Sequence, residues 1–326
     1  MANYLISGAV GFIAARVSQL LLDAGHSVIG LDNLNDAYDV RMKEYRLAAL
    51  REQNGFSFHQ IDIADWDAVN KLEPHLANIE AVINLAARAG VRASVKDPWV
   101  YVDTNVTGTL NLLEVCQRNN IPKFLLASTS SIYGQDAPLP TPETAPSDFP
   151  LQAYSASKKG AEAMCHAYHY LYDIDVSVVR FFTVYGPAGR PDMSIFRFIR
   201  WIIEGERVQV FGDGEQTRGF TYIDDIARGV ILALIPVGYE IINLGGHENI
   251  SMNGLIRLIE GKIGKDVVID YHEAARADMA ANLADVTKAG KLLGWEPAVS
   301  LEEGINRTIA WYRSNQEWAK QLDLNV

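Results

Sequence analysis

Tyr154 and Lys158 lie four residues apart in the segment YSASK. If this segment is helical, both side chains lie on one face of the helix. A lysine ammonium beside a phenol stabilises the phenolate and lowers the pKa of the tyrosine toward neutrality. Such a tyrosine can remove the proton of an alcohol. The same spacing also occurs on ordinary helices, so the pair needs support from elsewhere in the chain.

A glycine-containing turn near the N-terminus provides that support. Gly8 and Gly11 in LISGAVGFIAARV stand between an apolar run and a helical pattern. Gly8 permits a tight turn, Gly11 lets the backbone approach a pyrophosphate, and Ala14 is a small residue suited to helix–strand packing. The pattern predicts a dinucleotide site whose nicotinamide would take the hydride of the same alcohol. A plain tight turn is the alternative.

Acidic residues that follow the next apolar runs refine this prediction. Asp32 ends the second run, where a carboxylate accepts bonds from the adenosine ribose and repels a 2′-phosphate, so NAD is favoured over NADP. An ordinary turn cap within DNLND is the alternative for Asp32. Asp62 is expected either to face the adenine or to serve as a turn aspartate. The small residues at 85–87 would let the backbone pass close to the cofactor.

Four hydroxyl side chains follow the apolar run KFLLA, namely Ser128, Thr129, Ser130 and Ser131. Thr129 is expected to hydrogen-bond the same alcohol hydroxyl as the tyrosine. The row contains no acid and no base, and this distinguishes it from related sites described below. Local capping of the loop after the strand is the alternative role for Ser130 and Ser131.

The elements that must position these residues alternate along the first half of the chain. Apolar runs at 3–7, 27–32, 56–62, 81–86, 123–128 and 176–182 predict buried parallel strands, and helical patterns separate them. This predicts an α/β fold with a doubly wound parallel sheet of the Rossmann type and a second, smaller α/β substrate lobe. The expected division is 1–183, with 222–247 returning to it, against 184–221 and 248–326. FGDGEQTRGF is expected to be a loop.

Composition excludes several classes of protein. The chain has 326 residues and a net charge of −11, which argues against a nucleic-acid binder. Cys116 and Cys165 lie in apolar helical patterns and indicate reduced core residues of a cytoplasmic protein. No uncharged apolar window is long enough to span a membrane, and a strand pattern begins too early for a signal peptide. The histidines show no metal-ligand spacing, so no metal is predicted.

The chain resembles the extended short-chain dehydrogenase/reductases, and within them the nucleotide-sugar epimerases. The resemblance is closest to the UDP-glucuronate 4-epimerases and spans nearly the whole chain. It rests on GLDNLNDAYDVRMKEYRLAAL, NLAARAGVRAS, STSSIYG, YSASKKGAEAM, RFFTVYGPAGRPDM and GDGEQTRGFTYIDDIARGV. The chain departs from the family pattern at Ala14, at Asn84 and Arg88 in place of His and Gln, and at Gly219 in place of Asp.

The resemblance implies an NAD-dependent isomerase with Thr129, Tyr154 and Lys158 as its catalytic residues. The implied cofactor contacts are Gly8, Gly11, Phe12, Ile13, Asp32, Asn33, Asp62, Ile63, Leu85, Ala86, Ala87, Asn105, Tyr154 and Lys158. The implied substrate contacts are Arg92, Thr129, Ser130, Ser131, Thr183, Arg190, Arg218, Arg276 and Asp278. Arg218 matches the phosphate-binding arginine of the family and Asp278 the uridine-ribose contact, whereas Arg276 lies one residue out of register.

The hydroxyl row indicates which reaction follows the first step of the family, oxidation at C4 of a UDP-sugar. Dehydratases resemble TDEVYG and decarboxylases resemble TSEVYG, whereas this chain has TSSIYG without the acid. Oxidised glucuronate is a β-keto acid that loses CO₂ readily. Hydroxyl donors at Ser130, Ser131 and Thr183, with Arg190, would hold its carboxylate and suppress that loss. The predicted reaction is therefore C4 epimerisation of UDP-glucuronate to UDP-galacturonate.

Other functions stay open at this point. UDP-glucose 4-epimerase activity is the nearest alternative, a UDP-glucuronate decarboxylase is weaker, and a non-catalytic NAD-binding protein belongs to a different class. The helices expected at about 101–118 and 154–172 are apolar on more than one face. In the family such helices form a homodimer through a four-helix bundle, and burial within one chain is the alternative.

Overall fold

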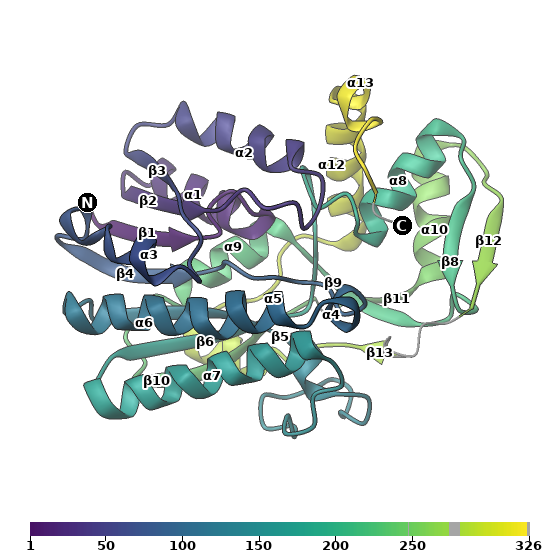
Figure 1. Cartoon of the computed structure of the whole chain (residues 1–326). Helices are drawn as coiled ribbons and strands as arrows, with labels where there is room; N and C mark the ends of the chain where they lie inside the picture. The colour runs from purple at the N-terminus through teal and green to yellow at the C-terminus, as the bar shows by residue number, and fades with distance from the viewer. Residues whose placement is uncertain (247, 274–280, 325–326) are drawn as a thin grey trace.

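The computed structural model describes residues 1–246, 248–273 and 281–324. At its centre is a parallel seven-stranded sheet of order β10-β6-β5-β4-β1-β2-β3 (Figure 1). The strands are β1 (Asn3–Ser7), β2 (Ser27–Asp32), β3 (Phe56–Gln60), β4 (Ile79–Asn84), β5 (Lys123–Thr129), β6 (Asp175–Phe181) and β10 (Tyr239–Leu244). The predicted fold class is confirmed.

Helices cover both faces of this sheet because neighbouring strand residues point to opposite sides. Ile6 and Leu125 pack with α1 (Phe12–Asp23), α2 (Arg41–Arg51), α9 (Ile223–Leu232) and α11 (Thr287–Leu293). Leu5 and Phe124 pack on the other face, with α3 (Trp66–Asn70), α6 (Gly108–Arg118) and α7 (Ala153–Tyr172). The inner strands are therefore largely apolar, as the sequence predicts for a sheet covered on both faces, whereas the edge strand β3 (FSFHQ) is only partly buried.

The helix expected at about 101–118 is interrupted. It consists of α5 (Trp99–Val102), a π-helical segment (Asp103–Thr107) and α6. The short helix α4 (Ala93–Lys96) precedes it. A π-helical turn redirects side chains and occurs frequently at functional sites. Here it contains Asn105, which is 1% exposed.

A second group of elements lies beyond the carboxyl ends of the central strands, on the right of Figure 1. A separate core contains residues of α8 (Ser194–Glu204), α10 (Met252–Ile263) and α12 (Leu301–Ser314). β8 (Val208–Phe211) pairs with β12 (Ile269–His272), and β9 (Thr217–Tyr222) pairs with β7 (Thr183–Tyr185), β11 (Asn249–Ser251) and β13 (Ala281–Asn282). The exact division into two lobes remains a prediction.

Two sequence-based boundaries were wrong. The segment 211–220 was expected to be a loop, but β9 begins at Thr217 because β7, β11 and β13 supply pairing partners from distant parts of the chain. The fourth strand was expected at 81–86, but β4 spans Ile79–Asn84. Its end leaves residues 85–87 outside the strand. Among the described residues, no helix is long and apolar enough to cross a membrane.

Candidate active site

A pocket of about 250 Å³ opens at the carboxyl ends of β1, β2, β4 and β5. The strand order reverses between β1 and β4, and ligands of doubly wound sheets bind at such a switch point. All of the expected cofactor contacts except Asn105 line this pocket, as do Thr129 and Arg190. The pocket therefore extends from the glycine turn to the Tyr154–Lys158 pair.

The glycine turn is shaped by close contact with the end of β4. Gly8 has a φ of +68°, and a Cβ there would lie 2.7 Å from the Cα of Ala86. The Gly11 amide donates to the Gly8 carbonyl at 2.7 Å, and α1 begins at the next residue without a side-chain cap. The amide groups at the start of α1 are thus available to an anion, as a dinucleotide pyrophosphate requires.

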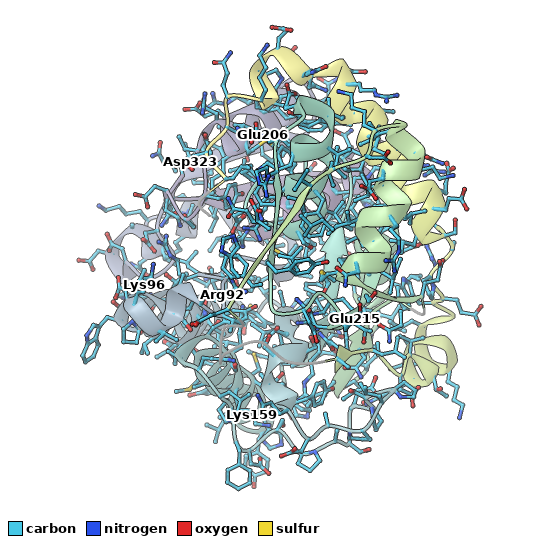
Figure 2. The ribbon with its side chains drawn as sticks, turned by 90° about the vertical axis from the view of Figure 1, so that its right-hand side faces the viewer. Arg92, Lys96, Lys159, Glu206, Glu215 and Asp323 are labelled. Atoms are coloured by element: carbon cyan, nitrogen blue, oxygen red, sulfur yellow. The ribbon has the colours of Figure 1, made fainter. Side chains whose placement is uncertain are left out.

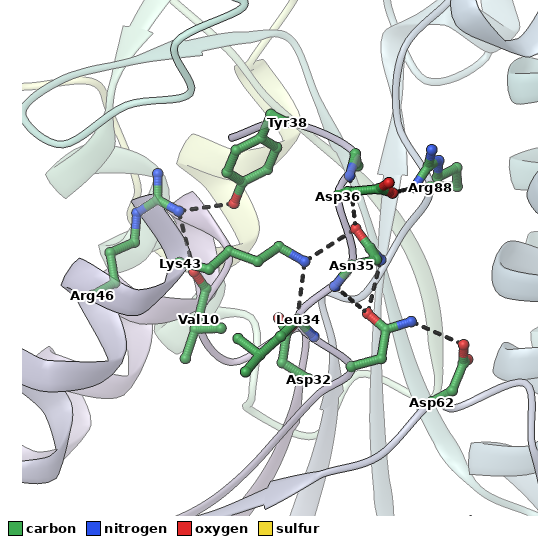
Figure 3. A network of polar contacts seen from close by, with 12 residues as sticks. Val10, Asp32, Leu34, Asn35, Asp36, Tyr38, Lys43, Arg46, Asp62 and Arg88 are labelled. Carbon is green, nitrogen blue, oxygen red and sulfur yellow. Dashed lines mark hydrogen bonds and ion pairs between the residues drawn. The ribbon is translucent and has the colours of Figure 1, made fainter. Parts of the chain in front are cut away.

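Polar side chains after β2 form a network on the pocket wall (Figure 3). Asp32 is 7% exposed, and its Oδ1 accepts hydrogen bonds from the Leu34 amide at 2.8 Å and from Lys43 Nζ at 3.1 Å. Asn33 donates to Asp62 at 2.9 Å, and Asp62 also accepts from the Ala64 amide. Asp62 therefore acts as a turn aspartate and lines the pocket as well.

Sequence reasoning missed Lys43, Asn35 and Tyr38, which all line the pocket. Lys43 bonds Asn35 Oδ1 at 3.1 Å in addition to Asp32. These residues belong to the loop after β2 and to α2, within the segment GLDNLNDAYDVRMKEYRLAAL that carries the family resemblance, but no role was predicted for them there. Only the proximity of Lys43 to Asp32 in the fold reveals that the predicted ribose-binding carboxylate is paired with a buried cation.

Tyr154 lies at the start of α7, beside the end of β5. Burial raises the pKa of the Tyr154 phenol, whereas a hydrogen bond with Thr129 and the charge of Arg190 lower it, and the net pKa lies above the usual value. Its ring packs edge-on against Tyr101, with ring centres 6.1 Å apart. The direction of the pKa shift is opposite to the predicted one, because burial outweighs the favourable contacts.

Lys158 is 2% exposed, and its Nζ donates to the carbonyl of Ala127 at 2.8 Å. Burial lowers the pKa of Lys158 to about 8, although the Glu162 carboxylate one turn further along α7 acts to raise it. The predicted lysine–phenol coupling therefore does not appear in the Tyr154 pKa. Lys158 instead ties α7 to the strand that carries Thr129.

Several hydroxyl groups of the row already make hydrogen bonds within the protein. The Thr129 hydroxyl donates to Ser131 Oγ at 3.2 Å and accepts from the Ser131 amide, so Thr129 caps the turn after β5. Ser130 is 4% exposed and accepts a bond from Asn282 Nδ2 at 2.9 Å, which leaves its own proton able to donate. Local capping, the alternative raised from sequence for Ser130 and Ser131, is instead made by the Thr129 side chain.

Arg190 lines the pocket together with Tyr154. It bonds Asp192 through two nitrogens, at 3.0 and 2.6 Å, and lies 5.1 Å from the centre of the Tyr38 ring. Burial alone would lower the pKa of Arg190, but the Asp192 carboxylate holds that pKa above its usual value. Arg190 also lines a smaller adjoining pocket with Thr183. The two groups expected to meet the sugar carboxylate are thus close together.

Several expected contacts lie outside the main pocket. Arg92 stands near the middle of the face seen in Figure 2, and its guanidinium lies 4.3 Å from the centre of the Phe211 ring, at the end of β8. Arg218 is on β9 and donates to the Thr217 carbonyl at 2.7 Å. Arg276 and Asp278 lie outside the described residues.

Asn105 is the one expected cofactor contact that does not line the pocket. Its amide instead holds the backbone of Arg88, with bonds of 2.9 and 3.0 Å, and donates to Ser157 at 2.9 Å. Asn105 therefore supports the loop after β4 and the residue that precedes Lys158. Its predicted contact with the cofactor stays a prediction.

The departures from the family pattern have local contacts. Arg88 lies 3.9 Å from the fully exposed Asp36, across the network in Figure 3. Asn84 is buried and bonds Ser7 and Thr109. A Cβ at Gly219 would lie 3.0 Å from the Gly246 carbonyl oxygen, a tight contact that a larger residue would relieve only by a small backbone shift. In the described part of the chain, no group of His, Cys, Asp or Glu is arranged to hold a metal ion.

Comparisons with known proteins agree with this geometry. The model of the NAD dependent epimerase/dehydratase family matches residues 4–245. A UDP-glucuronate 4-epimerase of Thermodesulfobacterium geofontis is 54% identical over 323 residues, 99% of each chain. A Bacillus cereus UDP-glucuronic acid 4-epimerase, solved with UDP-glucuronic acid and NAD, is 35% identical with a TM-score of 0.90, covering 96% of this chain and 99% of that one. A Thermotoga maritima UDP-glucose 4-epimerase with UDP-glucose is 32% identical with a TM-score of 0.89 and the same coverage.

Proposed function

Because the chain belongs to the NAD dependent epimerase/dehydratase family, we propose that it is an NAD-dependent enzyme that inverts C4 of UDP-glucuronate to give UDP-galacturonate. One observation carries the choice of substrate. The strand beside Tyr154 ends in a hydroxyl row without an acid, 129–131. Thr129 of this row lines the pocket with Arg190, and Ser130 and Ser131 follow it outside the pocket lining. The similarity to UDP-glucuronate 4-epimerases supports this choice over the alternatives.

The pocket fits NAD. The close approach of Gly8 to Ala86 and the uncapped start of α1 suit the pyrophosphate, and Asp32 is placed to accept bonds from the adenosine ribose. Lys158 and Tyr154 would hold the nicotinamide end. NAD, when bound, supplies the group that takes the C4 hydride and returns it to the opposite face of the sugar.

Tyr154 is the proposed base that removes the proton of the sugar 4-hydroxyl and later returns it. Thr129 shares a hydrogen bond with Tyr154 and is placed to position the same hydroxyl. Arg190, whose charge lowers the Tyr154 pKa against the effect of burial, favours the phenolate. Lys158 fixes α7 against the end of β5 and contributes its positive charge near neutral pH.

The sugar carboxylate must be held during the reaction, because the 4-keto form of glucuronate is a β-keto acid. Arg190 and Thr183 line one wall, and Ser130 retains a proton that can donate. Hydrogen bonds from these groups, together with Ser131, stabilise the carboxylate charge and restrict its rotation. A glutamate at position 131 would repel that carboxylate, so its absence favours epimerisation over loss of CO₂. Arg92, Arg218, Arg276 and Asp278 remain proposed contacts of the UDP moiety.

The test is proton NMR of the sugar products after incubation of the purified protein with UDP-glucuronate and NAD. UDP-galacturonate at a constant ratio to UDP-glucuronate is the expected result. Replacing Tyr154 with Phe should lower the rate at least about 100-fold while NAD still binds, because only the proton transfer is lost. UDP-pentose and CO₂ would instead identify a decarboxylase.

UDP-glucose 4-epimerase activity is the second candidate, since a structural neighbour solved with UDP-glucose is almost as similar in fold. Arg190 is already paired with Asp192, but its guanidinium can still add a charge-assisted hydrogen bond to a carboxylate, which a neutral hexose lacks. Parallel incubation with UDP-glucose separates the two. Turnover of UDP-glucose at a rate equal to or above that of UDP-glucuronate would overturn the proposed substrate.

We also propose a homodimer and a cytoplasmic location. Exposed apolar side chains on α5 and α7, Trp99, Val102, Tyr170 and Leu171, support a contact with a second copy. The buried, unpaired Cys116 and Cys165 fit a reducing compartment. Light scattering of the purified chain would measure its oligomeric state, and a monomer would contradict the proposed dimer.

A further inference from the structure

Arg46 of α2 joins three segments beside the pocket, and Figure 3 shows its contacts with two of them, at Val10 and Tyr38. Its Nη1 donates to the Val10 carbonyl at 3.1 Å and to the Tyr38 hydroxyl at 2.8 Å. Its Nε and Nη2 donate to the Ala188 carbonyl at 3.1 and 2.7 Å. Val10 lies inside the glycine turn, Tyr38 in the loop after β2, and Ala188 in the loop before α8. One side chain therefore connects the dinucleotide turn to the loop that carries Arg190.

The positions of these acceptors require an arginine at position 46. Arg46 is 5% exposed, and within the described ranges no carboxylate lies within ion-pair distance of it. A buried charge without a counterion is costly, and it persists only where several hydrogen bonds compensate. The planar guanidinium donates on three sides at once, whereas a lysine ammonium is a single point and cannot span the same acceptors. Core packing alone would favour an apolar residue here.

The loop that Arg46 holds is strained and carries a pocket residue. Ala188 has a φ of +54°, a left-handed conformation that costs about 1 kcal/mol or more for a residue with a Cβ. Two of the four Arg46 bonds stabilise its carbonyl. Arg190 follows two residues later and packs on the face of Tyr38, which Arg46 also bonds. Asp192 bonds Arg190 directly, and Arg46 reaches Arg190 through the Tyr38 ring and the Ala188 backbone.

We propose that Arg46 is a positioning residue that sets Arg190 against the substrate carboxylate, and that it links this position to the dinucleotide turn through Val10. The inference rests on the proposed function, in which Arg190 meets the carboxylate. Arg46 touches neither the substrate nor the reacting atoms. Its effect is on selectivity: it gives the pocket its preference for an acidic over a neutral hexose.

The experiment compares Kd values of UDP-glucuronate and UDP-glucose, measured by calorimetry with NAD present, for the wild type and for Arg46→Lys. The wild type should prefer UDP-glucuronate, and Arg46→Lys should reduce that preference about tenfold while the Kd of UDP-glucose changes little. Arg51→Lys, an exposed position on the same helix, is the matched control and should keep the wild-type ratio. A general structural defect would weaken both ligands alike and leave the ratio unchanged.

Tyr38→Phe provides a second, milder variant, because it removes only the hydroxyl that accepts from Arg46. It should shift the ratio in the same direction by a smaller factor, and it tests the inference if Arg46→Lys does not fold. An unchanged ratio in the variants that fold would overturn the inference, as would a wild type that does not prefer the acidic sugar. Turnover of the wild type by NMR reports separately on the proposed function, since binding preference does not require catalysis.

Discussion

The sequence predicted the spacing of Tyr154 and Lys158 on one helix face, but it did not predict the directions of their pKa shifts. Their spacing on α7 follows from local helix geometry. Their pKa shifts follow from burial, which disfavours the charged form of each and therefore lowers the pKa of the lysine and raises that of the tyrosine. Opposite shifts of this kind cannot be read from residue types alone.

The lowered pKa of Lys158 predicts a pH dependence of stability. Below about pH 8 the lysine is charged in both the folded and the unfolded chain, and between about 8 and 10.5 it is charged only when unfolded. The unfolded state then binds more protons, so stability should rise with pH across this window. The fall of the pKa from 10.5 to about 8 corresponds to roughly 3 kcal/mol.

The measurement is urea unfolding of NAD-free wild type and Lys158→Met at about pH 7.5 and about pH 10.5. The wild-type free energy of unfolding should gain roughly 3 kcal/mol over that of Lys158→Met between these two pH values. Lys71→Met, at an exposed position, is the control for general effects of high pH. A difference between wild type and Lys158→Met that does not change with pH would contradict the buried, shifted lysine.

At the scale of elements, a buried ion pair fixes α7 to the sheet. Arg180 of β6 donates to both carboxylate oxygens of Glu162 on α7, at 2.9 and 2.7 Å. Ser128 of β5 donates to the same carboxylate at 2.6 Å. Glu162 lies one turn after Lys158, and Ser128 precedes Thr129. The pair therefore sets the helix of the predicted base against the strand that carries Thr129.

Replacing Glu162 with Gln should lower the free energy of unfolding by about 3 kcal/mol or more. Arg180 is 1% exposed, and the substitution removes the carboxylate charge of Glu162 that compensates its positive charge. Chemical unfolding of both proteins measures the difference. Glu303→Gln removes a pair with Arg307 that is about half exposed, and it should cost less than about 1 kcal/mol.

A double variant, Glu162→Leu with Arg180→Met, separates the charge from the packing. It should recover much of the stability that Glu162→Gln loses, since neither buried charge remains. Equal losses in the Glu162→Gln and Glu303→Gln variants would show that the buried pair contributes no more than a surface pair.

At the scale of the whole molecule, positive side chains lie at the pocket although the net charge of the chain is negative. The chain carries a net charge of −11, yet Arg190 lines the pocket and Arg92 lies on the face onto which the strands open. A UDP-sugar acid brings a diphosphate and a carboxylate to this face. Binding must rely on locally concentrated cations that overcome the repulsion of the remainder of the protein.

This arrangement predicts a salt dependence of the KM for UDP-glucuronate. Raising the ionic strength from about 0.05 to about 0.3 M should increase that KM severalfold, because screening shortens the reach of the local cations. The kcat should change little, since the buried contacts around Tyr154 are screened far less. Initial rates at several salt concentrations provide the measurement, and a KM that falls with salt would indicate that net repulsion dominates instead.

Much of the fold followed from the sequence because it depends on local patterns. The apolar runs and helical periodicities specified the order of strands and helices, and the fold class is confirmed. The glycine turn, the hydroxyl row and the tyrosine–lysine spacing are short motifs, and all three border the pocket. The strand β9 was missed because its pairing partners lie in distant segments.

Contacts between segments far apart in the chain were decided only by the tertiary structure. The sequence motifs do not reveal the contacts of Lys43 with Asp32, Asn282 with Ser130, or Arg46 with the carbonyl of Ala188. The sequence by itself indicated the residue types of this chemistry, because each motif is local, and it placed Tyr154 and Lys158 on one helix face. The tertiary structure determined which side chains surround the pocket, because the carboxyl ends of parallel strands, and the loops that follow them, lie at the same edge of the sheet.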